Sequence, residues 1–135
     1  MTAGQTSVTV RAALWCTTDD SDAADPALTC SGGEDDSGAP HLKMARGAPL
    51  DVKVPQEVSS APWVIVFAYN DTSGAAHGDR TQVFAPNAQV DYTLQPPTGA
   101  QLTRVEVQVL TAAPATGGGV EYPATQTWVL LVDPA

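Results

Sequence analysis

The stretch that decides the fold is Trp63-Val64-Ile65-Val66-Phe67-Ala68-Tyr69, an unbroken apolar run. Most of its residues are β-branched or aromatic, and these types are enriched in strands. The run is too short for a membrane span, and Pro62 and the turn residues 70–74 limit it on both sides. Because both faces of the run are apolar, it predicts a central strand that is covered on both sides.

Apolar residues that alternate with polar ones predict further strands before and after this run. The alternating sets are Val8, Val10, Ala12 and Leu14; Leu50, Val52 and Val54; Val90, Tyr92 and Leu94; Val105, Val107 and Val109; and Trp128, Leu130 and Val132. Shorter strands are expected at 41–44 and, at the edge of a sheet, at 81–85.

No stretch of the chain has the period of an amphipathic helix, and eleven prolines and eleven glycines interrupt it. The sequence therefore predicts an all-β protein, a single antiparallel β-sandwich of about seven strands over residues 1–135. We expect an immunoglobulin-like architecture without common ancestry, because both cysteines precede Trp63 and cannot form the inter-sheet disulfide of antibody domains. The side chains expected to be buried are Trp63, Ile65, Phe67, Val105, Val107, Leu130 and Val132.

The chain is acidic, and its charge is unevenly distributed. Its 135 residues include six Lys and Arg against fifteen Asp and Glu, which gives a net charge of −9. Nucleic acids and anionic lipid surfaces bind clusters of Lys and Arg, so neither partner is expected. Residues 17–40 are predicted to form one long acidic loop, which holds Asp19, Asp20, Asp22, Asp25, Glu34, Asp35 and Asp36.

Two cysteines, Cys16 and Cys30, enclose the first half of that loop. An even number of cysteines at this separation favours a disulfide that ties the loop to the first strand, and disulfides persist in oxidising compartments. Two free thiols are the alternative, whereas zinc is disfavoured because no Cys-x-x-Cys motif is present. The first residues do not resemble an export signal, so we expect either a cytosolic protein or one whose signal has been removed. The disulfide favours the extracytoplasmic location.

Candidate catalytic and metal-binding residues are few. His41 and His77 both lie in loop sequence, and the absence of a Gly-x-Ser-x-Gly motif indicates surface histidines rather than a nucleophilic site. The acidic loop is a candidate calcium site, but it lacks the calcium-loop signature, so a solvated loop is favoured. Trp63 and Trp128 fall in phase with core residues, whereas Trp15 is expected to be exposed and suits a contact surface better. No catalytic residue, cofactor or metal site is predicted.

Several segments together resemble a known family. They are Gly47 to Pro55, Pro62 to Tyr69, Val83 to Pro86, Val90 to Leu94, Gln101-Leu102 with Val105 to Gln108, and Thr127 to Leu130. This set resembles the uncharacterised actinobacterial family called domain of unknown function 2771, whose members look like exported lipoproteins or secreted proteins. The resemblance implies an envelope location and no particular activity. The sequence departs from a lipoprotein in having no lipid-acceptor cysteine at its beginning.

The sequence alone does not specify the function of this domain. We expect a non-enzymatic extracytoplasmic envelope domain, a binding or structural accessory module that acts as a monomer. An envelope protein is one possible partner, and contact with the membrane is expected only through a removed lipid anchor. The first alternative is a carrier of a small apolar ligand between the two sheets, and the second is a hydrolase with an unrecognised site.

Overall fold

The structure, a computed structural model, describes the backbone of residues 1–3, 6–10, 12–19, 27–32, 38–110, 113–114, 120–121 and 124–135. It describes the side chains of residues 1–3, 8–10, 38–110, 124 and 126–135. Strands dominate within these ranges, and the one described helix, α1 (Gln56–Ser59), is a single turn. The prediction of an all-β chain is confirmed. No helix in the described ranges is long and apolar enough to cross a membrane.

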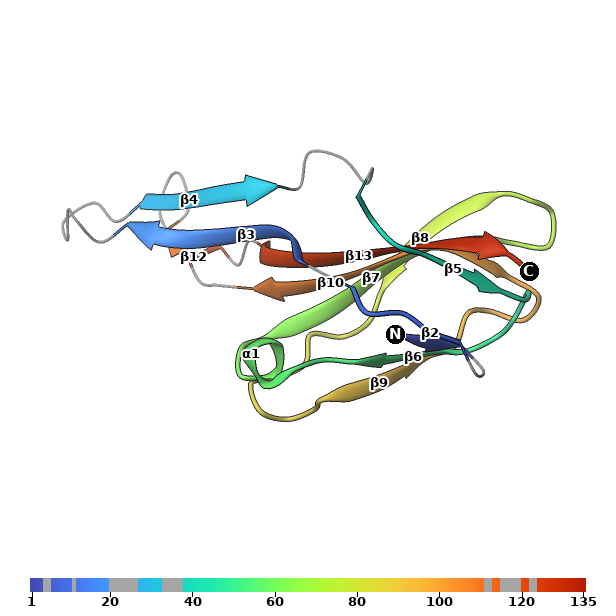
Figure 1. The fold of residues 1–135 in the computed structure, drawn as a ribbon, viewed down its shortest axis with the longest axis horizontal. Coiled ribbons are helices and arrows are strands. Elements are labelled where there is room, and N and C mark those ends of the chain that lie inside the picture. The colour runs from blue at the N-terminus through green and yellow to red at the C-terminus, as the bar shows by residue number, and fades with distance from the viewer. Residues whose placement is uncertain are drawn as a thin grey trace.

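The strands form two main sheets, which lie as two layers (Figure 1). The smaller sheet has the order β2-β1-β6-β9 and consists of β1 (Thr2–Ala3), β2 (Thr6–Ser7), β6 (Leu50–Lys53) and β9 (Asp91–Leu94). The larger sheet has the order β4-β3-β13-β10-β7-β8. Its strands are β3 (Ala12–Asp19), β4 (Ala27–Gly32), β7 (Trp63–Asn70), β8 (Ala76–Arg80), β10 (Gln101–Leu110) and β13 (Ala124–Pro134), with β5 (His41–Met44) beside β13. A separate pair joins β11 (Ala113–Pro114) to β12 (Val120–Glu121).

The hydrophobic core lies between the two main sheets and follows the predicted alternation. Leu50 and Val52 of β6 point inward, while Asp51 and Lys53 point to solvent. The larger sheet contributes the inward residues of β7, β10 and β13 to the same cluster. All the side chains expected to be buried are buried: Trp63, Ile65, Phe67, Val105, Val107, Leu130 and Val132. The sandwich-like arrangement thus results from burying one face of each sheet.

The prediction of a wholly antiparallel sandwich is wrong at one edge of β13. Its first half pairs antiparallel with β3, and its second half pairs parallel with β5, from Leu131 opposite His41 to Pro134 opposite Met44. Parallel neighbours need a long connection, and here most of the domain separates β5 from β13. The strand predicted at 41–44 is present, and the sheet that contains it is mixed.

The predicted loop at 17–40 is also wrong in part, because β3 extends to Asp19 and β4 occupies Ala27–Gly32. Only the first half of β3 lies against β13, with Trp15 opposite Gln126 as the last pair toward the ribbon. Beyond it, Cys16–Asp19 pair with β4, the one strand that the described residues place in register with them. Strands β3 and β4 therefore continue past the sheet as a two-stranded ribbon, which we call the β3–β4 ribbon (Figure 1). Backbone pairing, which needs no apolar alternation, forms β4 from residues that look like loop sequence.

The edge strand expected at 81–85 lies instead at β8, directly after the turn at 71–75. Two backbone hydrogen bonds close this turn. The Asp71 N–H donates to the Ala75 carbonyl at 2.9 Å, and the Gly74 N–H donates to the Asp71 carbonyl at 3.0 Å. The register that follows places Asn70 opposite Ala76. Every residue of β8 is exposed, as an edge strand paired only through its backbone permits.

Candidate functional site

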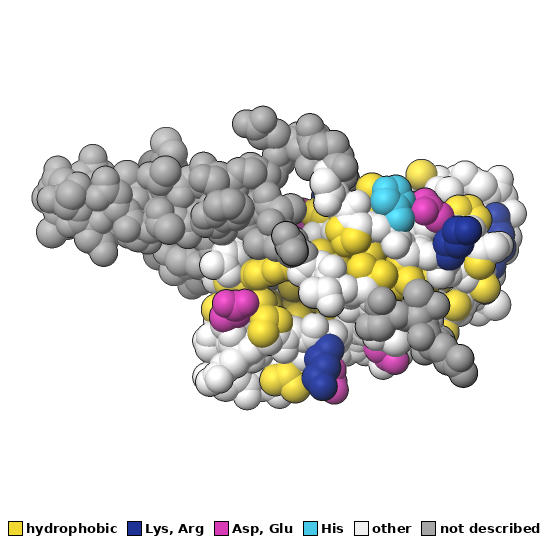
Figure 2. Space-filling model, in the orientation of Figure 1, with side chains coloured by type: hydrophobic (Ala, Val, Ile, Leu, Met, Phe, Trp, Pro, Cys, Tyr) yellow, Lys and Arg dark blue, Asp and Glu magenta, His cyan; other side chains and the backbone are white. Residues whose placement is uncertain are grey.

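A pocket of about 360 Å³ lies between the two sheets. Its walls come from the N-terminal segment at residues 1–2 and 8–10, the end of β6 with the residues that follow it, α1, and the inner faces of β10 and β13. Figure 2 shows apolar side chains gathered in a band across the middle of one face of the molecule, between the two layers of Figure 1. The volume lies within the range of small-molecule sites, about 300–1,000 Å³.

The local sequence explains why the pocket has an apolar floor. The alternation of β6 directs Val52 inward and continues to Val54, after which Pro55 ends the strand and α1 turns Val58 inward. All three valines are at most 8% exposed. Valine is branched at Cβ and has few rotamers, so these side chains form a stiff floor. The result is a concave apolar surface.

The opposite wall is formed by Val107 of β10 and Trp128 of β13, which are directly paired in register. Val107 is buried, whereas Trp128 is half-buried and packs against the periphery of the hydrophobic core. Trp128 therefore presents part of its ring to the pocket, where it offers a large flat contact surface. The predicted core role of Trp63 is confirmed, since it is fully buried and packs on Phe84 with ring centroids 4.4 Å apart.

The third wall of the pocket is the N-terminal segment of the chain. In β1 only Thr2 pairs with β6, opposite Asp51. The strand predicted from Val8 begins at Ala12, and both Val8 and Val10 instead line the pocket, half-buried. The β1–β2 pairing and two hydrogen bonds of 2.8 Å between the main chains of Met1 and Val8 hold this wall together.

Two charged residues stand at the rim of the pocket, Lys53 of β6 and Glu57 of α1. Both are exposed, and neither has an ion pair with any residue whose side chain is described. Asp91 lies opposite Lys53 in the β6–β9 register but forms no ion pair with it. Among its described side chains, the site thus combines an apolar interior with the basic Lys53 and the acidic Glu57.

Each predicted surface histidine lies against a carboxylate, away from the pocket. His41 Nδ1 is 3.0 Å from Asp133 Oδ2, and His77 Nε2 is 2.7 Å from Asp71 Oδ2. All four side chains are at least 36% exposed. Neither pair lines the pocket. The interpretation as surface histidines agrees with this placement.

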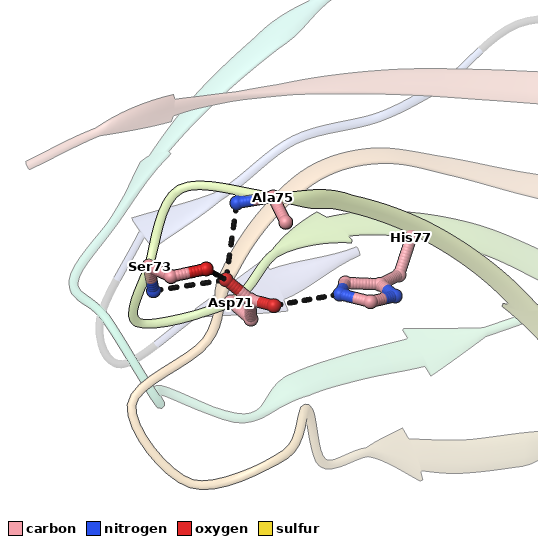
Figure 3. A network of polar contacts seen from close by, with 4 residues as sticks. All are labelled: Asp71, Ser73, Ala75 and His77. Atoms are coloured by element: carbon pink, nitrogen blue, oxygen red, sulfur yellow. Dashed lines mark hydrogen bonds and ion pairs between the residues drawn. The ribbon is translucent and has the colours of Figure 1, made fainter.

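The environment of His77 differs from that of a catalytic triad (Figure 3). Asp71 Oδ1 accepts the Ser73 hydroxyl at 2.6 Å and the backbone N–H groups of Ser73 and Ala75 at 2.9 and 3.0 Å. Hydrogen bonds from the Ser73 side chain, and then from His77, hold the pKa of Asp71 well below its usual range. In a triad the histidine accepts the serine proton, whereas here the serine donates to the aspartate. This network shapes the turn before β8.

Several predicted site residues lie outside the described side chains. They are Trp15, both cysteines, and the carboxylates of the candidate calcium loop: Asp19, Asp20, Asp22, Asp25, Glu34, Asp35 and Asp36. The backbone does place Cys16 directly opposite Cys30 in the β3–β4 register. Among the described side chains, no group of three or more His, Cys, Asp or Glu residues is placed to hold a metal ion.

The pocket is not apparent from the sequence. The alternation predicts Val52, Val54, Val107 and Trp128 as inward-facing residues, but the gap between them depends on how far apart the two sheets stand. For Lys53 it predicts only an outward position on a strand. Pro55 followed by Gln56 and Glu57 is the one local signal that the strand ends at the pocket rim.

Comparison with known proteins assigns the chain to a family. Searches of curated proteins and of solved structures find no match. A family model described as "Protein of unknown function (DUF2771)" matches residues 1–133. The chain belongs to this family.

Proposed function

We propose that this protein is a non-enzymatic binding domain that holds a small apolar ligand in the pocket between its sheets. The observation that carries the proposal is the pocket itself, with its floor of buried valines and the half-buried Trp128. Among the described side chains, the walls include no histidine, cysteine or serine, and Glu57 is their one carboxylate. Hydrolysis generally needs a nucleophile beside a base or a pair of acids, so binding fits these residues better than hydrolysis does.

The proposed setting is the bacterial envelope or the extracellular space, as a secreted or lipid-anchored protein of actinobacteria. The resemblance of the family to exported lipoproteins supports this setting, and so does the register that places Cys16 opposite Cys30. We also propose an immunoglobulin-like architecture, because two mainly antiparallel sheets enclose one core. Fractionation of the native host, followed by detection of the protein in membrane and secreted fractions, tests the location.

The binding proposal is tested with a neutral fluorescent probe that brightens in apolar surroundings, such as N-phenyl-1-naphthylamine. We expect saturable binding with one site per chain. Val54→Phe, which fills the floor of the pocket, should abolish the signal, while Val83→Phe should not, because Val83 is 50% exposed and does not line the pocket. Thr9→Trp fills the pocket from its exposed wall and replaces Val54→Phe if that variant does not fold. Equal probe binding by all three variants would contradict the proposal.

The β3–β4 ribbon favours a second function, docking of an envelope protein. Among the described residues, Cys16–Asp19 of the ribbon are in register with β4 and with no other strand. Projecting ribbons offer a free edge that an extended segment of a partner can join. Replacement of residues 17–29 by a short Gly-Ser turn should abolish capture of such a partner and leave probe binding intact.

A further inference from the structure

The charged residues at the rim of the pocket indicate the chemistry of the ligand's head group, whereas the apolar floor indicates only an apolar chain. Lys53 and Glu57 come from adjacent elements, β6 and α1, and are separated in sequence by the turn at Pro55. Neither charge is neutralised by an ion pair within the described side chains. Any ligand that fills the apolar floor and extends to the entrance therefore meets, among the described side chains, the positive Lys53 and the negative Glu57.

The two charges have different consequences for different head groups. An anionic head is attracted by Lys53 but repelled by Glu57, and the net charge of −9 opposes its approach. A cationic head is attracted by Glu57 and repelled by Lys53. A head group with both charges can interact with both residues at once. A wholly apolar ligand makes no use of either.

We infer that the ligand is a single-chain amphiphile with a zwitterionic head group. Its chain lies on the floor of Val52, Val54 and Val58, and its head lies at the entrance between Lys53 and Glu57. This inference rests on the proposed binding function and adds the chemical class of the ligand. Burial of the chain supplies most of the affinity, because removing apolar area from water is strongly favourable and exposed charge pairs contribute little.

The test compares three ligands with the same octyl chain, namely octylphosphocholine, octyl sulfate and octyltrimethylammonium. Titrations below the micelle concentration, followed by calorimetry and by Trp128 fluorescence with Trp128→Phe as reference, give the three dissociation constants. We expect octylphosphocholine to bind most tightly, by about two- to fivefold over each singly charged ligand, the range typical of exposed charge pairs. The preference should shrink as salt is raised, while binding of the chain persists.

Two variants at the rim make the inference specific. Lys53→Gln should weaken binding of the phosphocholine and the sulfate and strengthen binding of the ammonium ligand. Glu57→Gln should weaken the phosphocholine and the ammonium ligand and strengthen the sulfate. Lys43→Gln and Asp79→Asn change the same charges at exposed positions that do not line the pocket, and should leave the order unchanged.

The outcomes separate the two proposals. If all three ligands bind equally, or if the order of their dissociation constants is the same in both rim variants, the inference of a zwitterionic head group is contradicted. The proposal of an apolar ligand-binding pocket is unaffected by that result. If neither the octyl ligands nor the neutral probe bind to the folded protein, the proposed binding function itself is overturned.

Discussion

Val105 and Val107 lie two residues apart on β10 and face the same core, but their surroundings differ. Val105 is fully buried and does not line the pocket, whereas Val107 is 2% exposed and forms part of its wall. A carboxylate at position 105 has no access to water and no partner, so we expect Val105→Asp to unfold the domain at neutral pH. An aspartate at position 107 can reach the pocket, so its cost should be smaller.

Urea unfolding measures this difference. We expect no cooperative transition for Val105→Asp, a reduced midpoint for Val107→Asp, and a change within about 0.5 kcal/mol for the exposed control Val83→Asp. A Val105→Asp protein as stable as the control would mean that the inward face of β10 is misassigned.

Asp71 should make the stability of the turn before β8 depend on pH. Its pKa in the folded protein is lowered by the Ser73 and His77 side chains from the ordinary value of 3.8. The stabilisation is therefore fully present above about pH 4 and is lost as the pH falls toward the lowered pKa. The difference in melting temperature between the wild type and Asp71→Asn should be largest near neutral pH and shrink toward pH 2.

Asp79→Asn, which removes the same charge from β8, is the matched control for that measurement. A difference between wild type and Asp71→Asn that stays constant from pH 7 to pH 2 would contradict the assigned role of the Asp71 carboxylate.

At the scale of single elements, the β3–β4 ribbon shows what the cysteines are placed to do. Residues directly opposite in an antiparallel pair have Cα atoms about 4.5–5.5 Å apart, within the range of about 4.4–6.8 Å found for disulfides. Cys16 and Cys30 form such a pair, next to Trp15, which is the last residue of β3 with a described partner in β13. A two-stranded ribbon is only marginally stable alone, so a cross-link here would hold the ribbon at its base.

We predict that the oxidised protein contains a Cys16–Cys30 disulfide. In the chain-entropy model, closing this loop stabilises the folded state by about 3 kcal/mol. Mass spectrometry without reductant should find the protein two hydrogen atoms lighter than the dithiol. Reduction should increase amide exchange in β4 and lower the melting temperature modestly, while the far-ultraviolet β signal remains.

Cys16→Ser/Cys30→Ser should behave like the reduced protein and should not respond to reductant. Two free thiols in protein isolated from an oxidising compartment would remove the main residue-level argument for export.

On the scale of the whole molecule, a ligand held between the two sheets should stabilise the folded domain. At a free concentration one hundred times its dissociation constant, a ligand that binds only the native state adds about 2.7 kcal/mol. For a domain of this size, octylphosphocholine should therefore raise the melting temperature by several degrees. Val54→Phe should lose this increase, and Val83→Phe should retain it. An increase of the same size in Val54→Phe would place the ligand elsewhere on the molecule.

The sequence by itself determined the parts of the fold that depend on local side-chain pattern. The alternation in β6, β10 and β13 and the apolar run in β7 identified the strands and the buried residues. This works because a side chain's direction in a strand has a period of two, whatever the neighbouring strand is. The exposure of His41 and His77 was expected from loop-like sequence, but both residues lie on strands, β5 and β8.

Only the tertiary structure decided the features that depend on pairing between distant segments. Strands β4 and β8 form through backbone bonds to neighbours, and β5 lies parallel to β13 across most of the chain length. The pocket is likewise not a property of any one segment. It is lined by segments that lie far apart in the sequence, and the spacing of two packed sheets is set by all their side chains together.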